Sequence, residues 1–331
     1  MLPLTKRLLN DFQREFPLNP EPFDRLAREL DTSAEDLLEH LQALQVSGVV
    51  SRVGPVFRPN TIGASTLAAM AVPPAQLEQV AAGVNRFPQV NHNYEREHRF
   101  NLWFVLTAEN TQAIDDTLDA IRQQTGYEVM SLPLLRDFHI DLGFHLPFSH
   151  QADDSPVNGL LPSTPSSPVD PAHTGCAEDL IAAIQDGLPL VPRPYQAIAD
   201  RVGCSEAEVI AHLQEMLDRG VIKRLGVVVR HHELGYRANA MVVWDIPDDR
   251  VEYIGLQLGD QDCVTLCYQR PRRLPDWPYN LFCMVHGHDR GEVLACIERM
   301  AAILDIETIP HEVLFSGRRF RQRGAWYRMP R

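Results

Sequence analysis

Gly48-Val-Val-Ser-Arg52-Val-Gly54-Pro-Val-Phe-Arg58 is a stretch that this sequence uses twice. It returns later as Gly220-Val-Ile-Lys-Arg224-Leu-Gly226-Val-Val-Val-Arg230, and Gly63 returns at the same offset as Gly235. Chance rarely keeps several glycines and arginines in register over such a distance. A fixed internal period is the mark of a duplicated structural unit, so the two halves of the chain are predicted to share one fold.

The repeat continues toward the end of each half. Val90-Asn-His-Asn-Tyr94-Glu-Arg96 corresponds to Val264-Thr-Leu-Cys-Tyr268-Gln-Arg270, and Asn101-Leu-Trp-Phe corresponds to Asn280-Leu-Phe-Cys. Residues 150–175 between the halves are rich in proline and serine, a composition typical of flexible linkers. We therefore expect the halves to pair as a tethered pseudo-heterodimer.

Each half begins with apolar residues at helical spacing, in three short runs that end at Gly48 and Gly220. Ser205 and Glu208 form a capping box before the third run of the second half, and Ser33 and Asp36 stand in the same places in the first. Three helices followed by an apolar strand predict a winged helix-turn-helix domain over residues 1–60 and again over residues 176–232.

The remainder of each half reads strand, helix, strand, strand, helix, strand, which is the order of a ferredoxin-like domain. These domains are predicted over residues 61–149 and 233–331, the second with a basic C-terminal tail. The fold class is therefore α+β, a tandem repeat of both domains. Helix-turn-helix and ferredoxin-like domains in this order resemble the Lrp/AsnC transcription regulators over most of each half.

The charge of the chain opposes DNA binding. Forty-four acidic residues against thirty-one lysines and arginines give a formal net charge of -13, which repels nucleic acid at long range. The two predicted recognition helices, 33–45 and 205–218, contain acids and neither lysine nor arginine. Because recognition helices need basic or amide side chains for phosphates and bases, we expect no nucleic-acid partner. We treat these helices as scaffold or as a dimerisation surface.

The sequence contains no apolar run of membrane-spanning length and no apolar leader segment, so we expect a cytoplasmic protein without membrane contact. All six cysteines lie in the second half, and no pair has the two-residue spacing typical of zinc or redox sites. We expect them to be buried free thiols.

Polar side chains concentrate between His92 and Phe104. In an extended strand alternate residues share a face, so His92, Tyr94, Arg96 and His98 are predicted to project together. A solvated outer sheet face would show the same pattern. Tyr94 and Arg96 recur in the second half, however, whereas His92 is replaced by Leu266, which favours a site retained in one copy.

Arginines and aromatic residues are interleaved in two segments of the second half. Arg270-Pro-Arg272-Arg273-Leu-Pro-Asp-Trp277-Pro-Tyr279 is an insertion, and the C-terminus has six arginines and no acid from residue 316 on. Guanidinium groups bind carboxylates in pairs and aromatic rings stack on flat ligands, so both segments suit a planar polycarboxylate. An exposed basic loop and a nucleic-acid tail are the alternatives. His231 and His232 could bind iron or a carboxylate, or be solvated.

These segments resemble the siroheme decarboxylases, in the form that fuses the two partner subunits of haem d-one biosynthesis. The resemblance rests on residues 92–104, on 277–287 and on Arg318-Arg319-Phe-Arg-Gln-Arg. It implies removal of carbon dioxide from two acetate side chains of siroheme to give didecarboxysiroheme. It also implies no cofactor of the protein's own, since the substrate carries the iron, and no metal beyond that iron.

The residues assigned from this reasoning fall into two groups. His98 or His92 is predicted to donate a proton, with Arg96 stabilising charge and Tyr94 completing the hydrogen bonds. The predicted substrate-binding residues are Arg52, Arg58, Arg99, Trp103, Arg224, Arg230, His231, His232, Tyr268, Arg270, Arg272, Arg273, Trp277, Arg318 and Arg319.

Several points stay open on the sequence alone. They are the identity of the proton donor, the ligand of the substrate iron, the number of sites, and any further oligomer or complex with related pathway proteins. The alternative function is a haem- or siroheme-sensing regulator of the Lrp/AsnC type that binds the ligand without catalysis.

Overall fold

The computed structural model of the protein describes residues 3–140, 175–229 and 238–327. These residues form two compact units. The first contains the described residues up to Ile62, residues 175–229 and Tyr327; the second contains residues 63–140 and 238–326. Each unit therefore takes one domain from each half of the chain, so that like domains associate.

The first unit contains the two helix-turn-helix domains. Their helices are α1(Pro3–Asp11), α2(Pro22–Glu29), α3(Ala34–Val46), α6(Gly175–Ile184), α7(Pro194–Val202) and α8(Glu206–Asp218). Ser205 and Glu208 form the predicted capping box of α8, and Ser33 accepts a hydrogen bond from the Asp36 amide in α3. The predicted winged helix-turn-helix is thus confirmed in both halves.

The repeated glycines and arginines join these two domains. Strands β1(Val50–Phe57) and β7(Ile222–Val229) pair antiparallel. A Cβ at Gly54 would lie 2.8 Å from Gly187 Cα, and a Cβ at Gly226 would lie 2.4 Å from the Gln13 carbonyl oxygen. Arg224 donates to that same Gln13 carbonyl. Close approach of backbones requires glycine here, which explains why the repeat keeps both glycines in register.

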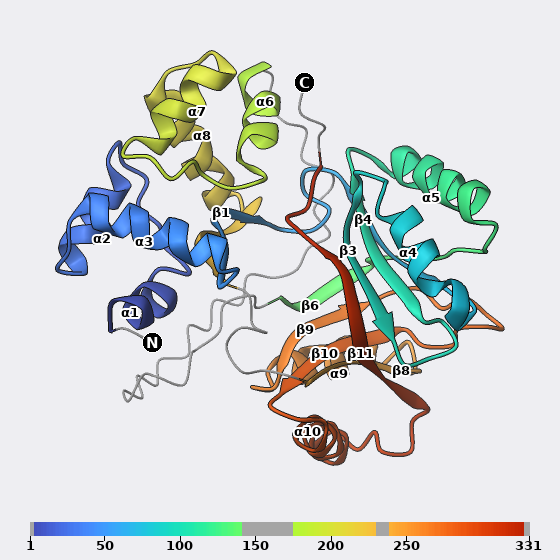
Figure 1. Ribbon diagram of the computed structural model, residues 1–331. Helices are drawn as coiled ribbons and strands as arrows, with labels where there is room; N and C mark the ends of the chain where they lie inside the picture. The colour runs from blue at the N-terminus through green and yellow to red at the C-terminus, as the bar shows by residue number, and fades with distance from the viewer. Residues whose placement is uncertain (1–2, 141–174, 230–237, 328–331) are drawn as a thin grey trace. The chain divides into compact units, whose positions relative to one another are not determined.

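The second unit contains the two ferredoxin-like domains (Figure 1). The first-half elements are β2(Ala64–Met70), η1(Pro74–Gln76), α4(Leu77–Val84), β3(Val90–Arg96), β4(Leu102–Ala108), α5(Thr111–Thr125), β5(Met130–Pro133) and β6(Arg136–Ile140). The second-half elements are β8(Ala238–Trp244), α9(Val251–Gly259), β9(Val264–Gln269), β10(Leu281–Gly287), α10(Arg290–Ile303) and β11(His311–Gln322).

All nine strands of this unit belong to one sheet, in the order β5-β2-β4-β3-β11-β8-β10-β9-β6. Its two edge strands, β5 and β6, are separated in sequence only by Leu134 and Leu135. Two residues span less than about 11 Å even when fully extended, so the sheet must curl until its edges approach. The Leu135 amide donates to the carbonyl of Gln269, the last residue of β9, and continues the pairing of β6 with β9. Arg270, the next residue, reaches the other edge, since its Nη1 donates to the Leu132 carbonyl of β5.

Strand β11 differs from its sequence prediction. Its first part pairs with β8 of its own half, and its second part, from Ser316, pairs with β3 of the other half. In Figure 1 it is the long dark red strand. The run Arg318 to Gln322, predicted as part of a basic C-terminal tail, is therefore strand. Strand β6 makes the reciprocal exchange by pairing with β9.

The two faces of the sheet have different cores. Helices α4 and α5 cover one half of the sheet and α9 and α10 the other, each over its own apolar cluster. A third cluster combines residues of both halves on the opposite face: Ala69, Trp103, Leu132, Met241, Val243, Trp277, Tyr279, Phe282 and Leu314. The faces without helices thus pack against each other, and this places the loops after β3 and β9 at the junction of the halves.

The repeated asparagines have a structural role. Asn101 accepts from the Val72 amide and donates to the Val72 carbonyl, and Asn280 does the same with Ile246. Asn101, directly before β4, thus fixes the backbone that follows β2. Asn280, directly before β10, fixes the backbone that follows β8.

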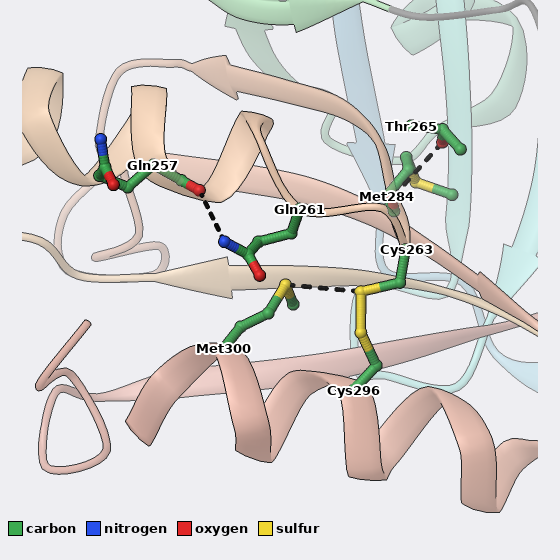
Figure 2. The surroundings of a disulfide bond; sticks show 7 residues. All are labelled: Gln257, Gln261, Cys263, Thr265, Met284, Cys296 and Met300. Atoms are coloured by element: carbon green, nitrogen blue, oxygen red, sulfur yellow. Dashed lines mark hydrogen bonds between the residues drawn. A yellow bond between two sulfur atoms is a disulfide. The ribbon is translucent and has the colours of Figure 1, made fainter. Parts of the chain in front are cut away.

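The expectation that all cysteines are free is wrong for Cys263 and Cys296, which form a disulfide with a Cα–Cα distance of 6.9 Å. Figure 2 shows that the bond joins the segment leading into β9 to helix α10, beside Met300. The sequence prediction failed because residues 33 positions apart give no spacing signal, and only helix packing brings them together. Cys267 and Cys283 are buried free thiols on neighbouring strands.

Candidate functional site

A polar cluster lies on the helix-free face of strands β3 and β11. The register places Tyr94 opposite Arg319 and His92 opposite Gln322, and directly opposed residues of an antiparallel pair share a face. The rings of His92 and Tyr94 stack, with centroids 6.3 Å apart. The structure therefore brings together His92, Tyr94 and Arg319, three residues singled out from the sequence, and adds Gln322.

The His92 ring has a defined orientation. Its Nδ1 lies 2.7 Å from Asn91 Oδ1, and the Asn91 amide in turn donates to Thr107 Oγ1. Because a carbonyl oxygen only accepts hydrogen bonds, His92 Nδ1 carries a proton here. The ring nitrogen that can take up and release a proton is therefore Nε2.

Arg319 supplies positive charge to this face. Its side chain is exposed, and Nη1 donates to Gln322 Oε1 at 3.1 Å. Within the part of the chain that the structure describes, it has no acidic partner. By contrast, the neighbouring Arg318 contacts Glu95 and Glu78. An arginine without a protein carboxylate next to His92 and Tyr94 suits an anionic ligand.

His98 lies apart from this cluster, beyond the end of β3. Its Nδ1 accepts from the Phe100 amide at 3.0 Å, and its Nε2 lies 2.6 Å from Glu312 Oε2. Both ring nitrogens are thus engaged by the protein. Burial, the largest cause, lowers the pKa of His98 in spite of the Glu312 carboxylate, so the neutral ring is favoured. The predicted convergence of His98 with His92 is not observed, because the chain turns away from the strand after Arg96.

One residue near His98, Glu312, was missed by the sequence analysis. Glu312 also accepts from the Tyr279 hydroxyl at 2.9 Å, and burial followed by this contact raises the pKa of Tyr279 to about 12. The repeat could have revealed Glu312, since Glu312-Val-Leu corresponds to Glu128-Val-Met in the first half.

The paired arginines of the repeat are structural contacts. Arg96 Nη1 donates to the Leu314 carbonyl and to Ser316 Oγ, and Arg270 Nη1 donates to the Leu132 carbonyl. Burial lowers the pKa of both guanidinium groups to about 10. The Arg270 guanidinium also lies 5.2 Å from the centroid of the Tyr268 ring.

The aromatic residues of the predicted ligand pocket lie in the core. Trp277 is fully buried and its ring centroid lies 5.2 Å from that of Trp103 and 5.6 Å from that of His98. Trp103 donates its indole N–H to the Phe100 carbonyl, whereas Trp277 Nε1 has no hydrogen-bond partner among the residues described. The insertion therefore supplies a core anchor between the halves.

The other predicted arginines contact the protein itself. Arg272 binds Asp245 and Asp248, Arg273 donates to the Ser131 carbonyl, and Arg99 binds Asp276. Arg52 and Arg224 belong to the first unit, where Arg52 donates to the Pro55 carbonyl, and burial lowers its pKa. Arg58 is half-buried in the same unit. Arg230, His231 and His232 lie outside the described residues.

The polar cluster occurs in one copy. At the equivalent positions of the second half, Tyr268 faces Asp137 and Leu266 faces Ile140. Tyrosine is kept, but the histidine, the arginine and the glutamine of β3 and β11 are replaced by leucine, aspartate and isoleucine. The described residues thus assemble a basic site on β3 and β11 and no equivalent on β6 and β9.

The described residues contain neither a metal-ligand cluster nor a membrane-spanning helix. No group of three or more histidine, cysteine, aspartate or glutamate side chains is arranged to hold a metal ion. None of the helices there has the length and apolar character needed to cross a bilayer.

Family models match both kinds of domain. The AsnC-like ligand binding domain matches residues 62–139 and 233–321, and the siroheme decarboxylase NirDL-like HTH domain matches residues 5–50 and 178–223. The α+β tandem architecture predicted from the sequence is confirmed by these matches.

Relatives extend over the whole chain. The siroheme decarboxylase NirDL subunit of Paracoccus denitrificans (strain Pd 1222) is 44% identical over 329 residues, which cover 97% of this chain and 96% of that protein. The siroheme decarboxylase NirL subunit of Stutzerimonas stutzeri is 49% identical over 154 residues, covering 46% of this chain and 91% of that subunit. Relatives of one half thus exist as separate chains.

Solved structures agree with the sequence relatives. The crystal structure of the siroheme decarboxylase NirDL has a TM-score of 0.70 and 29% sequence identity, over 98% of this chain and 94% of that chain. A structure of the siroheme decarboxylase NirDL in co-complex with an iron-uroporphyrin III analogue has a TM-score of 0.69, with the same identity and coverage.

Proposed function

This chain belongs to the siroheme decarboxylase family, and from that premise we propose that it removes carbon dioxide from two acetate side chains of siroheme. The product is didecarboxysiroheme, in which both acetates have become methyl groups, as haem d-one biosynthesis requires. The reaction is that of a carboxy-lyase. It uses no cofactor of the protein's own, since the iron enters with the substrate.

The observation that supports this proposal is the fixed orientation of the His92 ring, which leaves Nε2 to deliver a proton. Loss of carbon dioxide breaks a carbon–carbon bond and leaves the electron pair on a methylene carbon conjugated with a pyrrole ring. His92 Nε2 delivers the proton that completes the methyl group. Asn91 accepts from Nδ1–H throughout and stabilises the charged imidazolium that donates.

The sequence left His92 and His98 as alternative donors, and the contacts favour His92. To become a donor, His98 would need a second ring proton at Nδ1, where the Phe100 amide already donates. Its lowered pKa opposes the same change. His98 is therefore assigned to holding the loop after β3 in place.

Substrate carboxylates are held by Arg319 and by Tyr94, which lie opposite each other and next to His92 on the same face. Siroheme has eight carboxylates, and this acidic chain must bind them through local basic groups. Because the cluster is present once among the described residues, both decarboxylations are assigned to it, one after the other.

Anaerobic incubation with siroheme followed by mass analysis of the product tests the function. We expect a product lighter than siroheme by two molecules of carbon dioxide. Recovery of intact siroheme bound to folded protein would instead support the sensing regulator, which binds the ligand and leaves it unchanged.

A further inference from the structure

The loop that follows β3 joins the first half to the second through two charged pairs. Arg290 at the start of α10 donates to both carboxylate oxygens of Glu97, at 2.8 and 2.6 Å. Arg99 donates to Asp276 Oδ1 at 3.1 Å. Bidentate arginine–carboxylate contacts have demanding geometry, so they contribute specificity as well as energy.

The second half alone carries the partners for this loop. Arg290 follows the N-cap residue Asp289, and the equivalent position in the first half is Thr111, which follows the N-cap Asn110. The Arg290 guanidinium also rests 4.0 Å from the centroid of the Phe315 ring. Asp276 belongs to the insertion of the second half, so it has no counterpart in the first.

Two other charged contacts between the ferredoxin-like domains do not have this asymmetry. Arg318 contacts Glu78 at one junction, and Arg136 contacts Glu252 at the other. Both pairs join a strand to the helix of the opposite half. The His98–Glu312 contact is not selective either. If the partner were another first half, Glu128, which occupies the position of Glu312 in the repeat, would supply the carboxylate.

We propose that Glu97 and Arg99 form a recognition surface that selects a second half, or a separate subunit of that kind, as partner in preference to another first half. In a pair of first halves, Glu97 would face a threonine and Arg99 would lose its carboxylate. Specificity is a difference between affinities, and loss of a charged partner lowers the affinity of the wrong pair alone.

The contribution of the Glu97–Arg290 pair to the association of the halves depends on how far both side chains are exposed to solvent. Glu97 and Arg290 keep about half of their side-chain surface in solvent, at 53% and 57%. Hydrogen bonding from Arg290 lowers the pKa of Glu97, so the pair is charged at neutral pH. Removing one exposed pair costs little, but reversing one charge also adds repulsion, so Glu97→Arg is expected to raise the dissociation constant of the halves roughly tenfold.

The test uses the intact chain with a protease site inserted in residues 150–175. The purified, folded protein is cleaved, diluted and analysed by native mass spectrometry, which counts first–second and first–first pairs. We expect only first–second pairs for the parent protein. Glu97→Arg and Arg290→Thr should both weaken this pair and allow first–first pairs to form, and the double variant Glu97→Arg/Arg290→Glu should restore first–second pairing.

The matched control is Arg136→Glu, which removes a charged contact that both kinds of pair would make. It should weaken association without allowing first–first pairs, because a pair of first halves would make the Arg136–Glu78 contact at both junctions and would lose both. The proposal is overturned if Glu97→Arg and Arg136→Glu give the same ratio, or if the double charge reversal fails to restore the parent ratio. Arg290→Thr keeps the test valid should the Glu97 variant not fold.

Discussion

Arg96 and Arg270 occupy equivalent positions in the two halves. Each donates to a backbone carbonyl of the other half, Arg96 to a residue of β11 and Arg270 to a residue of β5. Arg96 reaches the Leu314 carbonyl at 3.1 Å, and Arg270 reaches the Leu132 carbonyl at 2.6 Å. Since their lowered pKa values of about 10 leave both charged at neutral pH, two buried cations hold the curled sheet together.

The first prediction concerns these contacts. Replacement of Arg96 by methionine leaves the Leu314 carbonyl and Ser316 without this donor and should lower the free energy of unfolding by roughly 2 to 4 kcal/mol. Urea unfolding followed by circular dichroism measures the change. Arg319→Met, at an exposed position of the same sheet, is the control and should stay within about 0.5 kcal/mol of the parent. Equal stabilities of the two variants would contradict the assignment.

The second prediction is a dependence of stability on pH. Burial, followed by the charge of Arg96, lowers the pKa of His286 from 6.5 to about 4. The unfolded chain therefore takes up a proton before the folded one, so stability is full above pH 6.5 and falls as the pH drops toward 4. The loss should approach about 3 kcal/mol, from 1.36 kcal/mol per pKa unit.

Unfolding curves recorded from pH 7 to pH 4 measure this slope, and His286→Gln should flatten it. Gln257→Ala, at an exposed position of α9 without a titrating group, should keep the parent slope. If both variants retain the parent slope, another group is responsible for it.

The third prediction separates the two candidate histidines by kinetics. His92→Ala should bind siroheme and slow single-turnover decarboxylation by roughly two to four orders of magnitude, the effect of losing a positioned acid. His98→Gln should instead lower stability and change the rate less. Titration with siroheme followed by rapid-quench product analysis provides both numbers. A larger loss of rate at His98 than at His92 would reverse the assignment.

The fourth prediction compares two arginines singled out from the sequence. Arg319→Ala should weaken siroheme binding by roughly 1.5 to 3 kcal/mol per charged hydrogen bond lost, with little effect on the rate of the bound complex. Arg272→Ala should lower protein stability and leave the binding constant nearly unchanged, because Arg272 contacts Asp245 and Asp248. Absorption titrations of both variants decide between the two roles.

The fifth prediction concerns the disulfide. Because Cys263 and Cys296 are 33 residues apart, closing this loop should stabilise the protein by roughly 2 to 4 kcal/mol. Thermal unfolding with and without a dithiol reductant measures the difference, and Cys263→Ser should abolish it. Cys204→Ser is the control, since Cys204 is not part of this disulfide and belongs to the other unit.

The sequence alone determined the domains and their class. Apolar spacing, caps and the repeat are local signals, so helices such as α8 and strands such as β3 could be located from neighbouring residues. The shared face of His92 and Tyr94 follows from the two-residue period of a strand. The resemblance carried by residues 92–104 then identified the family.

Only the tertiary structure decided which residues of the two halves meet. The exchange of β6 and β11 places Arg319 beside Tyr94 and Glu312 beside His98, and no local pattern encodes contacts across more than two hundred residues. An arginine that recurs in both halves gives the same sequence pattern whether its guanidinium group binds a ligand or a backbone carbonyl. Burial and hydrogen bonding distinguish the two cases, and these are set by how the curled sheet packs one half against the other.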